Sequence, residues 1–160
     1  MRRAAFFDRD GVLNVDHGYI YKPADWQWQE GAVEALQWLQ SRGYALVVVT
    51  NQSGIGRGMY SETDLQALHD WVGQQLLSHG IKFDGIYYCP HLPEDGCDCR
   101  KPKPGMLLRA IEVHHLDPAA SFLIGDKQSD LDAAEAAGVK GVLFTGGNLL
   151  RAVQAASEVS

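Results

Sequence analysis

The sequence has no long apolar run, and this absence sets the first limit on its function. The longest such run, residues 44–49, is far shorter than the roughly 20 residues that a membrane-spanning helix needs. Near the start, only Ala4–Phe7 separate the basic residues 1–3 from Asp8, whereas the core of a signal peptide needs about 7 apolar residues. We therefore expect a cytoplasmic protein without a membrane partner.

Positive charge is also scarce. The chain has 14 Lys and Arg against 20 Asp and Glu, which gives a net charge of -6 at pH 7. This balance disfavours nonspecific binding to nucleic acids and to anionic membranes. An anionic ligand must therefore be held by a few local positive groups or by a metal ion.

Cysteine is rare, and all three cysteines lie within residues 89–99. An odd, clustered set makes a poor disulfide framework, and with one histidine it forms a Cys3His set that suits a tetrahedral zinc ion. Four protein ligands leave no open position, so this zinc would be structural. The alternative is three ordinary buried thiols beside a surface histidine. The predicted zinc ligands are Cys89, His91, Cys97 and Cys99.

Short apolar runs alternate with amphipathic stretches along the 160 residues, of which 46% are hydrophobic. Strand and helix in alternation predict one α/β domain, residues 1–160, with a mainly parallel sheet covered by helices on both faces. Residues 89–105 would be a zinc-binding loop inserted in it. The predicted strands are Ala4–Phe7, Tyr44–Val49, Gly85–Tyr88, Phe122–Ile124 and Val142–Phe144.

Helical periodicity is clearest between the second and third of these runs. Leu65, Leu68, Val72 and Leu76 share one helical face, and Ser61 is placed to cap it. Weaker helical patterns cover residues 33–39, 107–111 and 131–134, and Gly43, Gly80 and Gly138 stand where helices should end.

Polar residues follow three of the predicted strands. Asp8 and Asp10 come after the first, Thr50 ends the second, and Asp126 comes after the fourth. Ligands bind beyond the carboxyl ends of parallel strands, so these residues should form one site. Each aspartate alone would be read as a helix cap or a turn, but three coincident strand ends favour a site.

The chemistry of these residues indicates phosphoryl transfer. Crowded carboxylates are relieved by a hard cation such as Mg2+, and Asp126 offers a further ligand. Asp8 and Asp10 fit a nucleophile that forms an aspartyl phosphate and a general acid/base, while Thr50 and Lys101 could stabilise the transferring group. Asp130 and Asp132 lie near a helix start, and we interpret them as capping or supporting residues rather than ligands.

Asp8-Arg9-Asp10-Gly11, Thr50-Asn51-Gln52, Lys101 and Gly125-Asp126 together resemble the four motifs of the haloacid dehalogenase superfamily of Mg2+-dependent phosphotransferases. The resemblance spans residues 6–145. It implies a Rossmann-like three-layer α/β/α sandwich without a large cap domain. In that family's pattern, Asp8 is the nucleophile and Asp10 the general acid/base. Mg2+ is held by Asp8, the Asp10 backbone carbonyl and Asp126.

The zinc loop and the missing cap resemble the branch that dephosphorylates heptose 1,7-bisphosphate or histidinol phosphate. Residues 16–19, 50–58 and 101–106 resemble the heptose enzymes, which remove the 7-phosphate on the route to ADP-heptose and lipopolysaccharide. The insert between His91 and Cys97 is short, as in the histidinol-phosphate enzymes, which therefore remain the alternative. The substrate contacts implied are Asp16, His17, Gly18, Tyr19, Thr50, Asn51, Gln52, Ser53, Arg100, Lys101 and Lys127.

Two hypotheses from other functional classes are less well supported by the sequence. A phosphate-accepting signalling domain also uses an aspartate at a strand end, but Asp10 would activate water and shorten the life of the adduct. A non-enzymatic zinc module leaves the acidic strand ends unexplained. We therefore expect a cytoplasmic enzyme with Mg2+ and Zn2+, a small phosphorylated sugar as substrate, and a monomeric state, because no long apolar seam indicates an obligate oligomer.

Overall fold

The computed structural model describes residues 1–158, so residues 159–160 of the predicted domain lie outside the described part. Its centre is a sheet of five parallel strands in the order β3-β2-β1-β4-β5. The first strand has the predicted bounds, and the other four overlap their predicted runs with ends that differ by up to two residues. Their bounds are Ala4–Phe7 (β1), Ala45–Asn51 (β2), Gly85–Cys89 (β3), Phe122–Gly125 (β4) and Lys140–Leu143 (β5).

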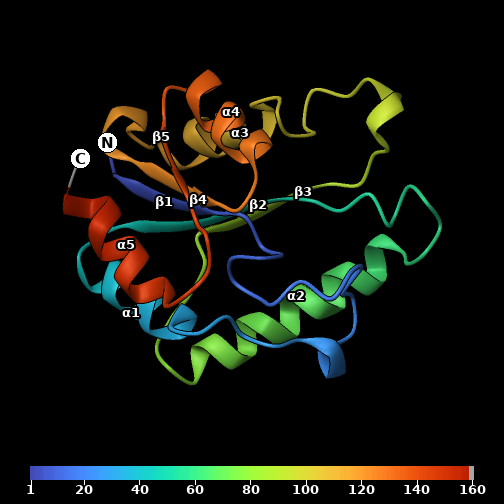
Figure 1. The fold of residues 1–160 in the computed structure, drawn as a ribbon, viewed down its shortest axis with the longest axis horizontal. Helices are drawn as coiled ribbons and strands as arrows, with labels where there is room; N and C mark the ends of the chain where they lie inside the picture. Colours follow the sequence, from blue (N-terminus) through green and yellow to red (C-terminus); the bar gives the residue numbers. More distant parts are fainter. Residues whose placement is uncertain (159–160) are drawn as a thin grey trace.

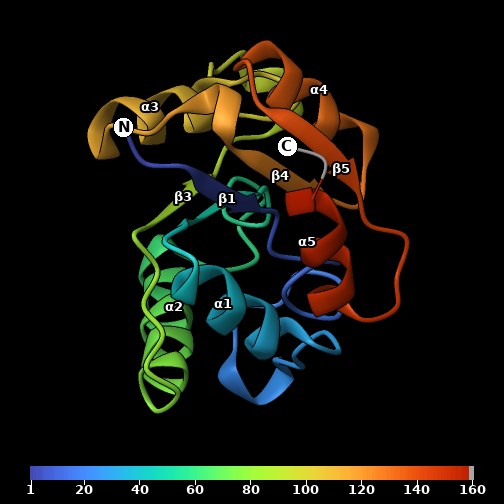
Figure 2. The ribbon, with the colours of Figure 1, turned by 90° about the vertical axis from the view of Figure 1, so that its left-hand side faces the viewer.

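Helices cover both faces of this sheet, as predicted. Figures 1 and 2 show α1, α2 and α5 on one side and α3 and α4 on the other. The layers are those of the Rossmann-like α/β/α sandwich. The helices are Ala32–Ser41 (α1), Glu62–Leu77 (α2), Gly105–His114 (α3), Gln128–Ala136 (α4) and Leu149–Glu158 (α5).

Burial on two faces explains why the central strand is apolar throughout. Ala5 and Phe7 enter the core shared with α1 and α2, while Ala4 and Phe6 enter the core beneath α3 and α4. All four side chains are fully buried. A strand with a helical layer on each side cannot alternate between apolar and polar residues.

The ends of the helices follow local chemistry. The side chain of Ser61 accepts a hydrogen bond from the Asp64 N–H (3.0 Å), and Asp64 accepts one from the Ser61 N–H (2.9 Å), which confirms the predicted cap of α2. Helix α5 was not predicted. Its buried residues Leu149, Val153 and Ala156 have helical spacing, and the helix packs beside α1.

The topology brings the polar strand ends to one edge of the sheet. The chain runs outward through β1, β2 and β3 and then returns to β4 on the other side of β1, so the β1–β4 boundary is a switch point where ligands typically bind. The insert, residues 89–105, leaves the same edge and contains a single 3-10 turn, Pro93–Asp95 (Figure 1). Within residues 1–158, no helix has the length and apolar character needed to cross a membrane.

Candidate active site

Three carboxylates meet at the switch point. Asp8 follows β1, Asp126 follows β4, and Asp130 lies in the first turn of α4; one oxygen from each lies within 4.8 Å of the other two. We call these residues the carboxylate cluster. Gly11 makes room for it, because a Cβ there would overlap the Asp126 carboxylate, and the φ of +87° also favours glycine.

Lys101 connects the insert to this cluster. Its Nζ donates to Asp8 Oδ1 (2.9 Å) and to the Val49 carbonyl (3.0 Å), and it forms a 2.5 Å ion pair with Asp130 Oδ1. Lys101 is only 4% exposed. The predicted phosphoryl-stabilising cation is therefore held next to the predicted nucleophile by contacts from three segments of the chain.

Burial and charge act in opposition on this pair. The pKa of Asp8 is raised to about 7, mainly by burial; the charge of Lys101 opposes this rise, and the charge of Asp130 adds to it. Burial alone would lower the pKa of Lys101, but Asp8 and Asp130 together raise it. Lys101 is therefore a permanent cation, and a second positive charge at the cluster would favour the ionised form of Asp8.

Asp130 has a larger part in the site than the sequence indicated. Its Oδ2 accepts a hydrogen bond from the Lys127 N–H (3.2 Å), as expected of a cap, but Oδ1 pairs with Lys101. The signal in the sequence was its position only four residues after Asp126, which indicated that it could reach the same site but not which group it would pair with. Asp132 is exposed and accepts a hydrogen bond from Gln128 Nε2 (2.9 Å).

The carboxylate cluster fits a hard divalent cation. Asp126 Oδ1 is buried and has no hydrogen-bond partner among residues 1–158, although a buried carboxylate oxygen normally has one. Lys101 pairs with two of the three carboxylates, Asp8 and Asp130, so the cluster keeps an excess of negative charge over this lysine. Oxygen ligands with this excess suit Mg2+.

Asp10 lies beside the cluster and is held on both oxygens. Arg9 donates to Oδ1 from Nη2 (2.7 Å) and Nε (3.2 Å), and Asn14 Nδ2 donates to the same oxygen (3.0 Å). Gln52 Nε2 donates to Oδ2 (3.0 Å). Arg9 is itself buried and bonds the Ile20 carbonyl (2.7 Å), so the loop after β1 is anchored to Asp10.

An open cleft lies above these groups. Most of the residues predicted to touch substrate line it, as does Gly54 from the predicted segment 50–58. Tyr60, Ser129 and Asp130 also line it and were not predicted to do so. Residues 16–19 and the start of α4 are far apart in sequence, and both contribute to its lining. The predicted residues on its wall are Asp8, Asp10, Asp16, Gly18, Tyr19, Asn51, Gln52, Ser53, Lys101 and Lys127.

Three other predicted residues lie elsewhere. Thr50 is fully buried below the cleft, where its Oγ1 accepts from Gln52 Nε2 (3.0 Å). Of the described residues, neither His17 nor Arg100 lines the cleft. His17 bonds Gln27 Oε1 (3.1 Å), and Arg100 Nη1 is buried without a partner among residues 1–158.

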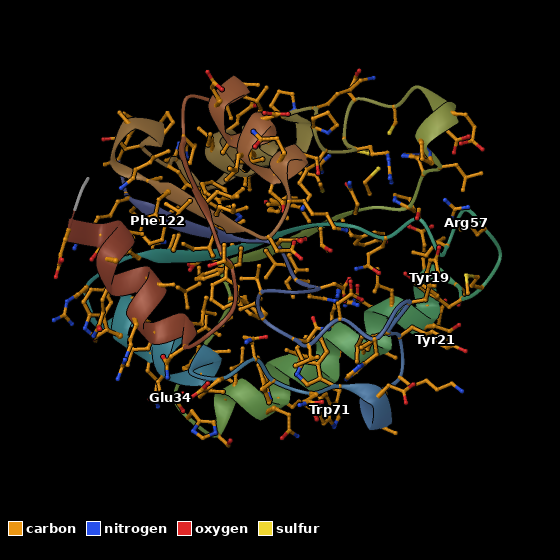
Figure 3. The ribbon with its side chains drawn as sticks, viewed as in Figure 1. Tyr19, Tyr21, Glu34, Arg57, Trp71 and Phe122 are labelled. Atoms are coloured by element: carbon orange, nitrogen blue, oxygen red, sulfur yellow. The ribbon has the colours of Figure 1, made fainter. Side chains whose placement is uncertain are left out.

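Figure 3 shows Tyr19 and Arg57 together at the end of the molecule that holds the cleft, and Phe122, at the start of β4, at the opposite end.

The thiols and the histidine of the insert also converge. Cys89, His91, Cys97 and Cys99, which we call the cysteine cluster, bring their ligand atoms within 4.8 Å of one another. Cys89 Sγ lies 3.3 Å from His91 Nδ1, 3.5 Å from Cys97 Sγ and 2.8 Å from Cys99 Sγ. All three thiols are free. Three sulfur atoms and one imidazole nitrogen are a donor set compatible with zinc.

Comparisons with known proteins identify the family of this chain. The chain is 53% identical over 146 residues to the D-glycero-beta-D-manno-heptose-1,7-bisphosphate 7-phosphatase of Haemophilus ducreyi, a match that covers 87% of this chain and 80% of the relative. The Escherichia coli enzyme of the same name is 48% identical, covering 85% and 75%. Residues 98–158 match the HAD-hydrolase-like family model. The chain belongs to this family of haloacid dehalogenase-type hydrolases.

A solved structure of a family member has the same fold as this chain. The D,D-heptose 1,7-bisphosphate phosphatase of B. bronchiseptica, solved with magnesium and phosphate, superposes with a TM-score of 0.85 at 36% identity and covers 96% of this chain and 86% of its own. The resemblance deduced from the motifs is thereby confirmed, as is the sandwich fold. The magnesium in that family member agrees with the acidic composition of the carboxylate cluster.

Proposed function

We propose that this chain is a Mg2+-dependent phosphatase that removes the 7-phosphate of D-glycero-D-manno-heptose 1,7-bisphosphate through an aspartyl phosphate. The observation that carries the proposal is the pairing of Asp8 with Lys101, beside an Asp10 carboxylate that lies in the same cleft. The names of the family members support the choice of substrate.

The reaction has two half-reactions. Asp8 attacks phosphorus, the bond between phosphorus and the sugar oxygen breaks, and Asp10 gives its proton to that oxygen. Asp10 then takes a proton from a water molecule, which attacks phosphorus and releases phosphate and free Asp8. Lys101, which already contacts Asp8, stabilises the charge of the transferring group in both steps.

Two metals belong to the proposal. Asp8, Asp126 and the Asp10 carbonyl would hold Mg2+, which, when bound, offsets the charge that carboxylates and phosphoryl oxygens bring together. The cysteine cluster would hold a structural Zn2+ that keeps the insert folded. Lys101 lies two residues after Cys99, the last zinc ligand. An ordered insert would therefore help to hold its side chain beside Asp8.

Substrate selection would come from the loops around the cleft. Residues 16–19 and 51–53 present polar groups there, which suits a sugar with several hydroxyls. The distal phosphate of a bisphosphate needs a cation, and Arg100 is our candidate, because its buried Nη1 has no partner among residues 1–158. Arg100 does not line the cleft in this structure, so its side chain would have to turn toward the substrate. His17 would have to release Gln27 to contact substrate.

The test compares three esters: the heptose 1,7-bisphosphate, histidinol phosphate and p-nitrophenyl phosphate. We expect the highest kcat/KM for the bisphosphate, and Arg100→Ala should reduce this preference more than it reduces hydrolysis of p-nitrophenyl phosphate. Arg109→Ala, on the exposed side of α3, is the matched control. A preference for histidinol phosphate would overturn the substrate and leave the phosphatase chemistry intact.

The setting of the reaction completes the proposal. Free thiols at the cysteine cluster suit the reducing cytoplasm, where sugar phosphates are made. We propose a monomer there that acts on the route to ADP-heptose and lipopolysaccharide. Sedimentation of the purified protein measures the oligomeric state directly.

A further inference from the structure

The two oxygens of Asp10 have different surroundings. Oδ1 accepts three hydrogen bonds, two from Arg9 and one from Asn14. Oδ2 accepts one, from Gln52 Nε2. Since a carboxylate oxygen offers about two lone-pair positions, Oδ2 is the oxygen that can still carry a proton toward the cleft.

The side-chain amide of Gln52 lies next to Asp10 Oδ2, so its orientation determines whether a donor or an acceptor faces this oxygen. Its Nε2 donates to both Asp10 Oδ2 and Thr50 Oγ1, each at 3.0 Å. Gln52 is only 3% exposed, so few water molecules can satisfy it. An amide keeps its shape when it turns by 180°, and therefore only its hydrogen-bond partners fix which end points to Asp10.

Tyr60 supplies the partner at the other end of the amide. Its hydroxyl donates to Gln52 Oε1 at 2.5 Å. The residue precedes α2, is 6% exposed, and stacks its ring on Tyr21 with 4.9 Å between the centroids. Burial raises the pKa of Tyr60 to about 12, so the hydroxyl keeps its proton in the neutral range.

We propose that Tyr60 is a positioning residue for the acid–base steps, because its hydroxyl fixes the Gln52 amide with Nε2 toward Asp10. In the opposite orientation Oε1 would face Asp10 Oδ2 and would accept a hydrogen bond from a protonated Oδ2, which would direct that proton away from the leaving oxygen. Tyr60 lies outside the four motifs that identify the family, and its role rests on the proposed phosphatase function.

The substitution that isolates this role is Tyr60→Phe, which removes the hydroxyl and keeps the stacked ring. An alkyl leaving group such as the sugar needs the proton of Asp10, whereas p-nitrophenolate leaves without it. We expect kcat/KM for the sugar phosphate to fall by about 10- to 100-fold, part of the ~10²–10⁴-fold that general acid–base catalysis supplies. The value for p-nitrophenyl phosphate should change less than about threefold, by the same reasoning.

Two further variants keep the inference open to refutation. Tyr88→Phe is the matched control, because its hydroxyl donates to Glu62 Oε1 (2.6 Å) away from the cleft; neither ester should be affected. In Gln52→Ala the amide is absent, so adding Tyr60→Phe should cause no further loss. Equal losses on both esters, or additive losses in the double variant, would show that the hydroxyl has only a structural role.

The result can be separated from the fate of the proposed function. Any alkyl phosphate that the wild-type protein hydrolyses gives the ratio of alkyl to aryl ester on which the inference depends. If the heptose bisphosphate is not hydrolysed but another sugar phosphate is, the proposed substrate fails and the role of Tyr60 is still measured. If wild type hydrolyses no phosphate ester with Mg2+ present, both fail.

Discussion

The carboxylate cluster and the cysteine cluster are assembled from different kinds of segment. The carboxylates come from the ends of β1 and β4 and from α4, and the strand order of the sheet brings them together. The cysteine cluster comes from one stretch, residues 89–99, which contains only a 3-10 turn. A rigid sheet can hold repelling charges in place, whereas a loop of this kind depends on its ligands for its shape.

The two clusters also differ in the donor atoms that they offer to a metal ion. Hard carboxylate oxygens beside a buried lysine suit a cation that also binds phosphate, and soft sulfur atoms suit one that is enclosed by protein. We therefore expect changes in the carboxylate cluster to affect turnover with little effect on the fold. Changes in the cysteine cluster should affect the fold of the insert first.

The largest effect is expected from Asp8→Asn. Loss of the nucleophile should lower kcat on the order of 10³-fold or more, while the melting temperature remains close to that of wild type because Asn fills the same space. Steady-state kinetics with Mg2+ and a thermal melt measure both. Asp132→Asn, an exposed carboxylate on α4, is the control and should keep full turnover. Near-normal turnover of Asp8→Asn would rule out the covalent mechanism.

Asp126→Asn should change the dependence on metal. Asp126 contributes an unpaired buried oxygen, and its loss should raise the Mg2+ concentration that gives half-maximal rate by at least ~10-fold. A Mg2+ titration at saturating substrate measures this, again with Asp132→Asn as control. An unchanged titration curve would mean that Asp126 is not a ligand.

Cys97→Ser should have a smaller effect on turnover. Wild type purified without added metal should contain about one zinc per chain, and the variant much less. The insert should then be cut more rapidly by protease, but kcat should fall only ~10-fold or less, since Lys101 keeps its contacts with Asp8, Asp130 and Val49. Asp98→Asn, an exposed neighbour, is the control. Wild-type protein without zinc would remove the metal from the proposal.

The smallest expected effect is on the free energy of unfolding, and it comes from the buried His69. Burial and the adjacent Arg9, whose Nη1 lies 3.3 Å from Nε2 of His69, lower the pKa of His69 to about 4 from 6.5. Between these values the unfolded chain binds a proton that the folded chain does not, so the free energy of unfolding should fall as the pH is lowered from 6.5 to 4.

Urea unfolding across that pH range tests this prediction. His69→Gln should lose this part of the pH dependence, and His79→Gln, an exposed histidine after α2, should keep it. An identical pH dependence in wild type and His69→Gln would mean that His69 is protonated equally in the folded and unfolded states.

The sequence predicted the parts of this protein that depend on local pattern. Apolar runs such as Ala4–Phe7 indicated strands buried on both faces, and Ser61 with Asp64 indicated the start of α2. The acidic residues after β1 and β4 and the clustered cysteines also stood out, because their spacing and their chemistry are visible in a few consecutive residues. Helix α5 was missed although Leu149 and Val153 have helical spacing.

Tertiary structure alone decided which distant groups are partners. Nothing in the sequence indicated that Asp130 pairs with Lys101, that Tyr60 fixes the amide of Gln52, or that His17 bonds Gln27 beside the cleft rather than within it. Side chains such as these find partners according to how loops fold back over the strand ends. A buried polar group must be satisfied by whatever lies within about 3 Å in space, and spacing along the chain does not record that distance.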